Sequence, residues 1–329
     1  MATNEVWVVT GASRGIGFAI AQRVAASGDA VALLARGDSV HAAAQSLGER
    51  ALGLQVDITE ETAVAEAINA VAQHFGCVTR LINNAGLHRG GRLGKLEVSD
   101  WQAVLKTNLE GTMLMARACE SGMSAGSSIT NIGAVVGFRG FPGDAAYAAS
   151  KAGLAGLTQA LAIEFAPRDI NVNLVIPGLV MTEMTEGLSE KALAALIRMV
   201  PKGRCAEPDE IAEVVEWVAR ARYMTGALVS VDGGLMSTFG SLRMRQTIGN
   251  RGTHVRVTHL CDHRAINILH HGMNNTLRVN NHINIICAST EQPTGFNKLQ
   301  PLVHHSCRID CNFSAHRPVR VCTGFIDCN

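Results

Sequence analysis

The sequence predicts an α/β fold in which a doubly wound parallel sheet carries helices on both faces. Three observations support this prediction. Apolar, Ala- and Gly-rich helical stretches alternate with strands rich in Val, Ile and Leu through the first 240 residues, as expected for a buried parallel sheet. The run 5–10 passes directly into a glycine turn and an amphipathic stretch. The composition then changes near residue 240, which predicts a single domain at 1–240 and an atypical C-terminal extension at 241–329.

The first predicted strand, at 5–10, leads into a loop that carries Gly11, Gly15 and Gly17. A helix is expected to follow at 18–26. Glycines let the backbone turn sharply and approach a pyrophosphate, while the free N–H groups at the start of the helix face the anion. Because the glycines stand between a strand and a helix, the loop indicates a dinucleotide site. A plain tight turn is the alternative.

Tyr147 and Lys151 stand four residues apart on a helix expected at 145–165. This spacing places the phenol and the ammonium on one helix face. There the ammonium is expected to lower the pKa of the phenol toward working pH, which favours proton transfer to or from an alcohol or a carbonyl. By itself the pair would fit an ordinary half-exposed helix face. The glycine loop upstream favours the chemical interpretation.

Four motifs in one order resemble those of the short-chain dehydrogenase/reductase family: Thr10-Gly11-x-x-x-Gly15-x-Gly17, Asn83-Asn84-Ala85-Gly86, Tyr147-x-x-x-Lys151 and Pro177-Gly178. The stretches 132–137, 147–153 and 231–234 are most similar to its 3-oxoacyl-[acyl-carrier-protein] reductases. The resemblance covers roughly residues 4–237. It implies a Rossmann-type fold and hydride transfer between a nicotinamide cofactor and a carbonyl or secondary alcohol.

The resemblance also implies roles for individual residues. Tyr147 would protonate the substrate oxygen, Lys151 would bond the nicotinamide ribose, and Asn108 would hold a proton-relay water. A third strand is expected at 53–57, ending on Asp57, which would face adenine. No metal site is implied. The implied cofactor-binding residues are Gly11, Ser13, Arg14, Gly15, Ile16, Gly17, Arg36, Asp57, Ile58, Asn84, Ala85, Gly86, Tyr147, Lys151, Pro177, Gly178, Val180 and Thr182.

The end of the second predicted strand, at 30–36, bears on the choice of nicotinamide cofactor. In this architecture a carboxylate there bonds the ribose 2′-hydroxyl of NAD, whereas a basic group admits the 2′-phosphate of NADP. Ala35 stands where the acid would be and Arg36 follows it. Arg14 is expected to close on the same phosphate. The sequence therefore predicts NADP(H) in preference to NAD(H), with the nearby Asp38 as the argument for NAD(H).

The serine that the family uses to bond the reacting oxygen is missing. It normally stands thirteen residues before the tyrosine, and here that position is Ala134. Ser127 and Ser128 are predicted at the start of the preceding strand, too far back to substitute. Loss of one such donor typically lowers turnover by about 10²–10³. Three explanations stay open: a substitution introduced to trap a complex, a substrate that brings its own polar group, or a cofactor-binding protein with weak catalysis.

The substrate is predicted to be a small-molecule or acyl-carrier-protein-bound carbonyl, with 3-oxoacyl thioesters favoured. Secondary-alcohol, dihydrodiol and polyketide ketoreductases are the alternatives. Arg168 stands where related reductases present a basic residue to the acidic carrier. The resemblance implies a homotetramer formed through the helix at 145–165 and a last strand at 227–231. It also implies a substrate lid at 181–201, whose apolar residues are Met184, Leu188, Leu193, Leu196, Ile197 and Met199.

Composition adds expectations about location and about the extension. No apolar run is long enough to cross a bilayer and Met1 leads almost at once into the first strand, so a cytoplasmic protein without membrane contact is expected. Residues 240–329 carry 10 basic and 4 acidic residues, but the lack of a recognisable module argues against nucleic-acid binding. Nine of the twelve histidines and six of the nine cysteines lie in this extension. Its composition suits no packed core, so poorly ordered structure is expected, arising from translation beyond the natural stop or in a shifted frame.

A zinc site is the alternative for the extension. The spacing lacks paired Cys-x-x-Cys units and a regular histidine pair. The residues that suggest such a site are His304, His305, Cys307, Cys311, His316, Cys322 and Cys328.

Overall fold

The computed structural model describes residues 5–182, 187 and 189–238, and the backbone of four short strands nearer the C-terminus. The strands of the first part are β1 (Val6–Thr10), β2 (Ala30–Ala35), β3 (Ala51–Gln55), β4 (Arg80–Asn83), β5 (Ser128–Ile132), β6 (Asn171–Pro177) and β7 (Leu228–Val231). The α-helices are α1 (Gly15–Ala26), α2 (Ser39–Gln45), α3 (Glu61–Phe75), α4 (Val98–Leu105), α5 (Gly111–Glu120), α6 (Val136–Arg139), α7 (Ala145–Phe165), α9 (Glu190–Ile197) and α10 (Pro208–Arg220). Shorter helical turns are η1 (Leu93–Lys95), η2 (Lys106–Glu110), η3 (Ala166–Arg168) and η4 (Leu235–Ser237).

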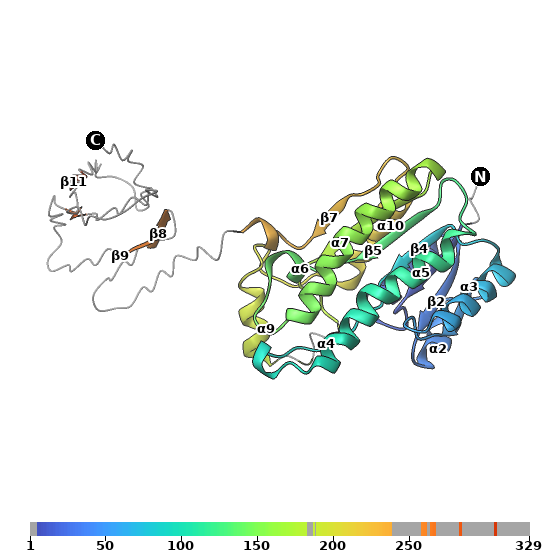
Figure 1. The fold of residues 1–329 in the computed structure, drawn as a ribbon, viewed down its shortest axis with the longest axis horizontal. Coiled ribbons are helices and arrows are strands. Elements are labelled where there is room, and N and C mark those ends of the chain that lie inside the picture. The colour runs from blue at the N-terminus through green and yellow to red at the C-terminus, as the bar shows by residue number, and fades with distance from the viewer. Residues whose placement is uncertain are drawn as a thin grey trace, which may run out of the picture. The chain divides into compact units, whose positions relative to one another are not determined.

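The sheet has seven strands in the order β3-β2-β1-β4-β5-β6-β7 (Figure 1). Every neighbouring pair is parallel. The chain winds outward from β1 to β3, then restarts with β4 on the other side of β1, which is the Rossmann-type order. The predicted fold class is therefore confirmed. The carboxyl ends of all seven strands meet at one edge, where ligands bind in such sheets.

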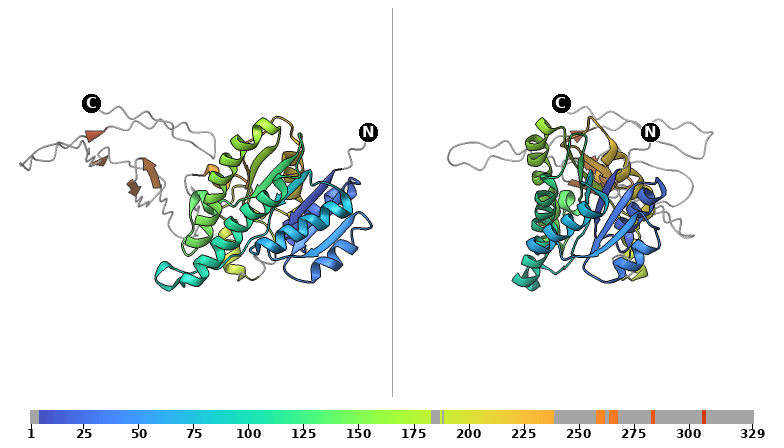
Figure 2. Two further views of the ribbon diagram at one scale, coloured as in Figure 1. Left: turned by 45° about the vertical axis from the view of Figure 1, so that its right-hand side comes forward. Right: turned by 90° about the vertical axis from the view of Figure 1, so that its right-hand side faces the viewer.

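Alternating side chains of each strand pack on the two faces of the sheet. Val6 and Val8 of β1 belong to one core cluster, whereas Trp7 and Val9 belong to the other. Helices α3, α5 and α7 cover the first face and α1, α2 and α10 cover the second (Figure 2). The buried runs that the sequence shows in its strands thus result from helices on both sides of the sheet.

Some predicted boundaries are shifted. The helix predicted at 18–26 begins at Gly15, and the strand predicted at 53–57 lies at 51–55. Asp57 is therefore beyond the end of β3. Its Oδ1 accepts hydrogen bonds from the N and Oγ1 of Thr59, at 2.9 and 2.8 Å, so Asp57 forms the turn that begins α3.

The chain divides into two compact units at Leu242 and Arg243. In the second unit, β8 (Thr258–Cys261) pairs with β9 (Arg264–Asn267), and β10 (Ile283–Asn284) pairs with β11 (Ser306–Cys307), both antiparallel. The sequence did not predict these strands, because strands of two to four residues are too short to show a hydrophobic periodicity. The predictions of poor order and of a zinc site in the extension concern side chains outside the described residues.

None of the helices in the described part of the chain is long and apolar enough to cross a membrane.

Candidate active site

The glycine loop connects β1 to α1 at the carboxyl edge of the sheet. Gly11 and Gly15 have φ angles of 63° and 58°, a backbone conformation that favours glycine. Arg14 precedes the helix in an extended conformation, and α1 has neither a side-chain cap hydrogen bond nor an acidic residue in its first turn. The first N–H groups of α1 are therefore suited to bind an anion.

Gly17 is packed so tightly that no larger residue fits. A Cβ on Gly17 would lie 2.4 Å from the carbonyl oxygen of Gly11 and 2.5 Å from Nδ2 of Asn84. That Nδ2 donates to the carbonyl oxygens of Thr10 and Gly11, at 3.0 and 3.2 Å. The Oγ1 of Thr10 accepts from the backbone N–H groups of Asn84 and Ala85, both at 3.0 Å. The glycine loop and the segment after β4 are thus one hydrogen-bonded unit.

Replacing Gly17 by alanine is expected to weaken NADPH binding at least tenfold, because the new methyl group must push the loop backbone or Asn84 out of place. Overpacking of this kind typically costs about 1–3 kcal/mol, and about 1.4 kcal/mol corresponds to a factor of ten in affinity. Fluorescence titration with NADPH measures the change. Gly94→Ala is the matched control, since a Cβ there meets nothing within 4 Å. Equal affinity of the two variants would contradict the prediction.

The segment after β6 also reaches the glycine loop. A Cβ on Gly178 would lie 2.6 Å from the Cα of Asp232, so 177–178 is packed closely against the chain that follows β7. A few residues later, Cγ2 of Thr182 is 3.6 Å from the position that a Cβ on Gly15 would take. Thr182 and Gly15, far apart in the sequence, therefore lie side by side.

Helix α7 carries Tyr147 and Lys151. Nζ of Lys151 donates to the carbonyl oxygen of Ile132 at the end of β5, at 2.8 Å, and lies 5.7 Å from the centroid of the Tyr147 ring. Burial lowers the pKa of Lys151 to about 8. Burial, with a further contribution from the Asp144 carboxylate, raises the pKa of Tyr147 to about 12.

The prediction that Lys151 lowers the pKa of Tyr147 is therefore wrong for the chain without a bound cofactor. The expectation was a lowered pKa for Tyr147, whereas burial raises it. The ammonium is directed at the backbone carbonyl of Ile132, and the loss of hydration penalises the phenolate more than the nearby cation favours it. At neutral pH Tyr147 keeps its proton, so it is suited to donate one.

Asn108 lies in the π-helical turn η2 between α4 and α5, a feature frequent at functional sites. Its Oδ1 accepts from the N–H of Leu87 at 2.7 Å, and its Nδ2 donates to the carbonyl oxygen of Leu87 at 3.0 Å. The same Nδ2 donates to Oγ of Ser150 at 2.9 Å, and this hydroxyl donates to the carbonyl oxygen of Tyr147 at 2.7 Å. Asn108 thus ties the segment after β4 to α7.

The predicted catalytic side chains converge around Gly86. A Cβ on Gly86 would lie 3.6 Å from both Oδ1 of Asn108 and Nζ of Lys151. Tyr147 is one turn before Lys151 on the same helix. The fold therefore brings all three to one place at the carboxyl edge, and the proton-relay water that Asn108 would hold stays a prediction.

Ala134 follows β5 in a fixed register. The N–H groups of the residues on either side of it donate to carbonyl oxygens of β6, at 2.8 and 3.1 Å. Ser127 and Ser128 are at the opposite end of β5, and the hydroxyl of Ser128 donates to the carbonyl oxygen of Ala219 at 2.7 Å. No shift of register can therefore replace Ala134 by either serine.

Comparison with known proteins agrees with this geometry. Residues 11–236 match the family described as enoyl-(acyl carrier protein) reductase. Carbonyl reductase family member 4 of Danio rerio is 44% identical over 235 residues, which are 70% of this chain and 98% of that protein. The human 3-oxoacyl-[acyl-carrier-protein] reductase is 40% identical, again over 70% of this chain and 98% of that protein. The chain belongs to the short-chain dehydrogenase/reductase family.

Structural comparison supports the same family. The crystal structure of a blue fluorescent protein from a metagenomic library, in complex with NADPH, matches with a TM-score of 0.68 and 34% identity, covering 71% of this chain and 98% of that chain. A short-chain dehydrogenase/reductase from Brucella melitensis matches with the same TM-score of 0.68 at 29% identity, covering 70% of this chain and 96% of that chain. The chain thus shares its fold with both structures, one of which binds NADPH.

Two arginines predicted to select the cofactor of this short-chain dehydrogenase/reductase are exposed at the ends of neighbouring strands. Arg14 lies in the loop after β1 and Arg36 directly follows β2. The carbonyl oxygen of Arg36 accepts from Nε2 of Gln55 at 2.8 Å, which holds the backbone there against β3. The position of Ala35 carries no acid, as predicted.

Two other predicted cofactor residues also make contacts within the chain, and their contact with a nucleotide stays a prediction. Asp57 directs Oδ1 to Thr59. Ile58 is buried in the core, where a Cβ on Gly111 would lie 2.8 Å from its Cδ1. The side chain of Ile58 therefore packs inward, which leaves only its backbone for contact with a nucleotide.

Arg168 also has local partners. It forms an ion pair with Glu120, donates to the carbonyl oxygen of Glu120 at 2.6 Å, and lies over the ring of Phe165 at 5.8 Å. Arg168, in the turn after α7, thus bonds the end of α5, and its contact with a carrier protein stays a prediction.

Part of the predicted substrate lid is described. Leu193, Leu196 and Ile197 lie on α9 and are half-buried, and Met199 is exposed. Met184 and Leu188 lie outside the described residues.

Sequence reasoning missed three polar residues beside the catalytic group. Ser150 stands between Tyr147 and Lys151, so helix spacing could have predicted that it lies close to both of them. His88 and Asp144 are 56 residues apart and carry no local signal, because only the fold brings them together.

Proposed function

We propose that the chain is an NADP(H)-dependent reductase that interconverts a carbonyl and a secondary alcohol, with 3-oxoacyl thioesters on an acyl carrier protein as its substrate class. The convergence of Tyr147, Lys151 and Asn108 around Gly86, beside the glycine loop, carries this proposal. The 3-oxoacyl reductases among the relatives and the NADPH complex among the structural neighbours support the substrate class and the cofactor.

The residues present fit a dinucleotide. The glycine loop has positive φ angles where a phosphate group must approach the backbone, and the start of α1 has no side-chain cap. Arg14 and Arg36 would bind the 2′-phosphate, and Asn84 to Gly86 and Pro177 to Thr182 would line the nicotinamide end. NADP(H) bound there supplies the hydride.

Tyr147 is the proton donor in this proposal. Its raised pKa keeps the phenol protonated at neutral pH, so the proton is available to a carbonyl oxygen that gains negative charge as the carbonyl is reduced. Lys151 is buried within reach of the phenol face, and its charge favours that developing oxyanion. Asn108 holds α7 and the segment after β4 in register. With Ala134, the oxygen has one donor fewer than the family normally provides.

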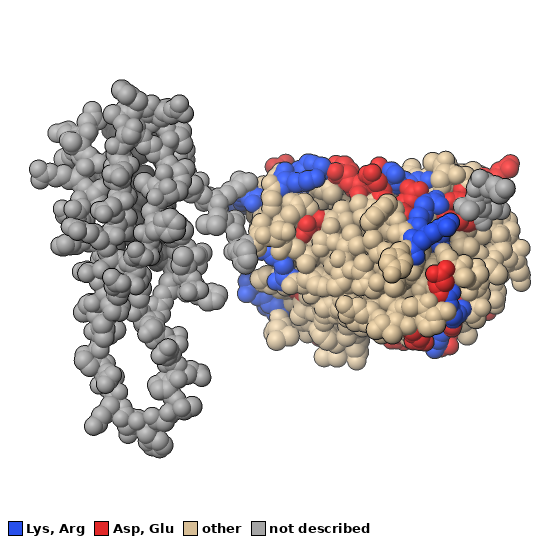
Figure 3. Space-filling model, turned by 90° about the horizontal axis from the view of Figure 1, so that it is seen from above, with Lys and Arg blue, Asp and Glu red and all other residues tan. Residues whose placement is uncertain are grey.

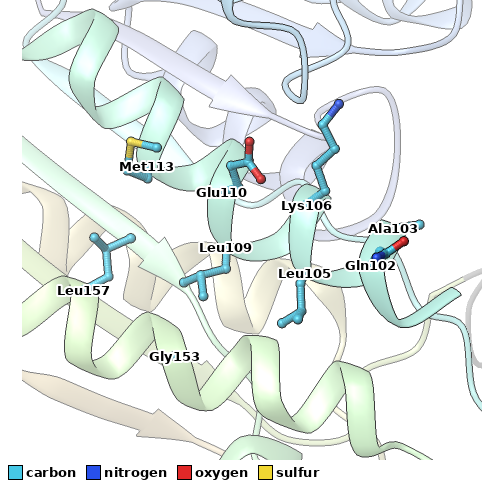
Figure 4. Close-up of a pocket in the computed structure, with 9 residues that line it drawn as sticks. All are labelled: Gln102, Ala103, Leu105, Lys106, Leu109, Glu110, Met113, Gly153 and Leu157. Carbon is cyan, nitrogen blue, oxygen red and sulfur yellow. The ribbon is translucent and has the colours of Figure 1, made fainter. Parts of the chain in front are cut away.

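Self-association through α7 is part of the proposal, and a homotetramer in the cytoplasm is the expected form. Leu105 and Leu109 point toward α7 across a shallow groove of about 760 Å³, with Leu157 and Gly153 on its far side (Figure 4). Ile163 on α7 is 79% exposed. Figure 3 shows a broad face with few charged side chains, with most of the Lys, Arg, Asp and Glu near its edges. Such a face suits a second copy of the chain.

The decisive experiment follows NADPH oxidation with an acetoacetyl thioester, an enoyl thioester and a small panel of ketones, in the protein and in Tyr147→Phe. Removing the phenol proton donor is expected to lower turnover about 10²–10⁴-fold without changing NADPH affinity. The enoyl thioester tests the activity in the name of the matching family. Ketone turnover alone would favour a secondary-alcohol, dihydrodiol or polyketide reductase.

Tyr223→Phe is the matched control, because Tyr223 is the other tyrosine of the chain and is fully exposed. Its turnover should equal that of the unmodified protein. An unchanged rate in Tyr147→Phe would contradict the proposal. It would favour the second candidate, a cofactor-binding protein with weak catalysis, for which Ala134 is the supporting observation.

A further inference from the structure

A histidine and a carboxylate lie directly against the candidate proton donor. Nε2 of His88, in the segment after β4, is 3.0 Å from Oδ1 of Asp144, which precedes α7. The His88 ring meets the Tyr147 ring edge to face, with centroids 5.1 Å apart and planes at 78°. The side chains of His88 and Asp144 are 34% and 18% exposed, so solvent reaches the pair.

The same pair lies where two loops meet. The N–H of Gly91 donates to the carbonyl oxygen of Gly143 at 2.8 Å. A Cβ on Gly90 would lie 3.2 Å from Cε1 of His88 and 3.3 Å from that carbonyl oxygen. Position and orientation of His88 are therefore set by a close contact between the segment after β4 and the start of α7.

Asp144 is at the N-cap position of α7, yet its side chain makes no cap hydrogen bond. Aspartate at this position normally stabilises a helix by accepting from the backbone, worth about 1 kcal/mol. Here the carboxylate bonds His88 instead. A residue that gives up its usual structural role for a contact beside the proton donor suggests a role in the site.

Other charged groups near the phenol, among the described residues, are engaged elsewhere. Lys151 on α7 donates to a backbone carbonyl of β5. Arg89, next to His88, pairs with Asp100 of α4 at 2.7 Å. Arg139 of α6 donates to Thr238 at 2.9 Å. Of these charged groups, Asp144 is the one whose charge raises the pKa of Tyr147, and it also bonds His88.

We propose that His88 and Asp144 are positioning residues for Tyr147, which fix the two loops beside the phenol and control, through the charge of Asp144, how readily the phenol gives its proton to a substrate oxygen. This inference rests on the proposed reductase function and extends it. The two residues act through Tyr147.

The sign of the effect follows from electrostatics. A carboxylate disfavours a nearby phenolate, and Asp144 contributes in this direction to the raised pKa of Tyr147. The bond to Nε2 of His88 holds the carboxylate of Asp144 beside the ring that packs on the phenol. Removing the charge of Asp144 should therefore make the phenol a stronger acid.

The first test reads Tyr147 without any substrate. In a Tyr223→Phe background Tyr147 is the only tyrosine, so its ionisation can be followed by tyrosinate absorbance after rapid mixing into alkaline buffers, with circular dichroism to verify the fold. Asp144→Asn is expected to lower the midpoint by about one pH unit. Asp100→Asn, which removes a carboxylate from the neighbouring ion pair, should leave it unchanged. A midpoint that Asp144→Asn does not move would overturn the proposal.

The second test measures kcat and KM for carbonyl reduction in His88→Gln, Asp144→Asn and the double variant. Each single variant is expected to shift kcat and leave KM unchanged, and His88→Gln should have no further effect once Asp144 is replaced. Independent, additive effects, or an unchanged kcat in both single variants, would overturn the proposal. If no substrate is turned over, the proposed function has failed, and the absorbance titration still decides whether Asp144 controls Tyr147.

Discussion

Replacing Ala134 by serine is expected to raise the turnover of a 3-oxoacyl thioester by about 10²–10³. The gain would come from a hydroxyl at the end of β5 that donates to the substrate oxygen as negative charge develops on it. Backbone hydrogen bonds on both sides of position 134 fix its register against β6. The new side chain would therefore need no rearrangement of the chain to reach its place. Steady-state NADPH oxidation by the two proteins measures the effect.

Ala134→Cys separates hydrogen bonding from volume. A thiol is a weak donor, so this variant should stay close to the unmodified protein, whereas a gain equal to that of serine would show that filling space is what matters. NADPH affinity should be the same in all three proteins, because position 134 is assigned to the substrate. No gain on restoring the hydroxyl, with NADPH still bound, would count against a reductase that lacks only its donor.

The sequence predicts those parts of the site that depend on local spacing. Gly11 lies in the strand-to-helix turn that the glycine pattern indicates, and Gly15 and Gly17 lie in the first turn of α1. Tyr147 and Lys151 share a helix with the predicted bounds. The absence of the serine also follows from counting residues, since the neighbours of position 134 on both sides are bonded to β6. Each of these follows from the period of a helix or strand.

The remaining features depend on what the fold brings together. The pKa of Tyr147 is raised because the fold removes water from the phenol, on which the His88 ring from the segment after β4 packs, and no local pattern reports such a contact. The side chain of Ile58 packs on Gly111, 53 residues further along the chain. His88 and Asp144 meet only because two loops at the carboxyl edge are hydrogen-bonded. Sequence reasoning on one chain has no access to such contacts.

Replacing Lys151 by methionine is expected to abolish turnover and, in the protein without NADPH, to raise the free energy of unfolding by about 2–3 kcal/mol at neutral pH. Folding lowers the pKa of Lys151 from its ordinary value of 10.5 to about 8. Because a pKa unit corresponds to about 1.36 kcal/mol, burial of the charged form destabilises the fold by about 3 kcal/mol. Methionine fills similar space without the charge, and the lost hydrogen bond to Ile132 offsets part of the gain.

The pH dependence distinguishes this effect from simple repacking. The unfolded chain holds the lysine proton up to about pH 10.5, whereas the folded chain releases it above about pH 8. The penalty is therefore complete below pH 8 and is lost as the pH rises toward 10.5. The stability difference between Lys151→Met and the unmodified protein should shrink over this range in urea unfolding at a series of pH values.

Lys106→Met is the control, since Lys106 is exposed and paired with Glu60, and its effect should stay within about 0.5 kcal/mol. If charged Lys151 weakens the fold below pH 8 but is needed for turnover, its role in the protein is chemical. Loss of stability in Lys151→Met, or a gain that does not depend on pH, would contradict this account.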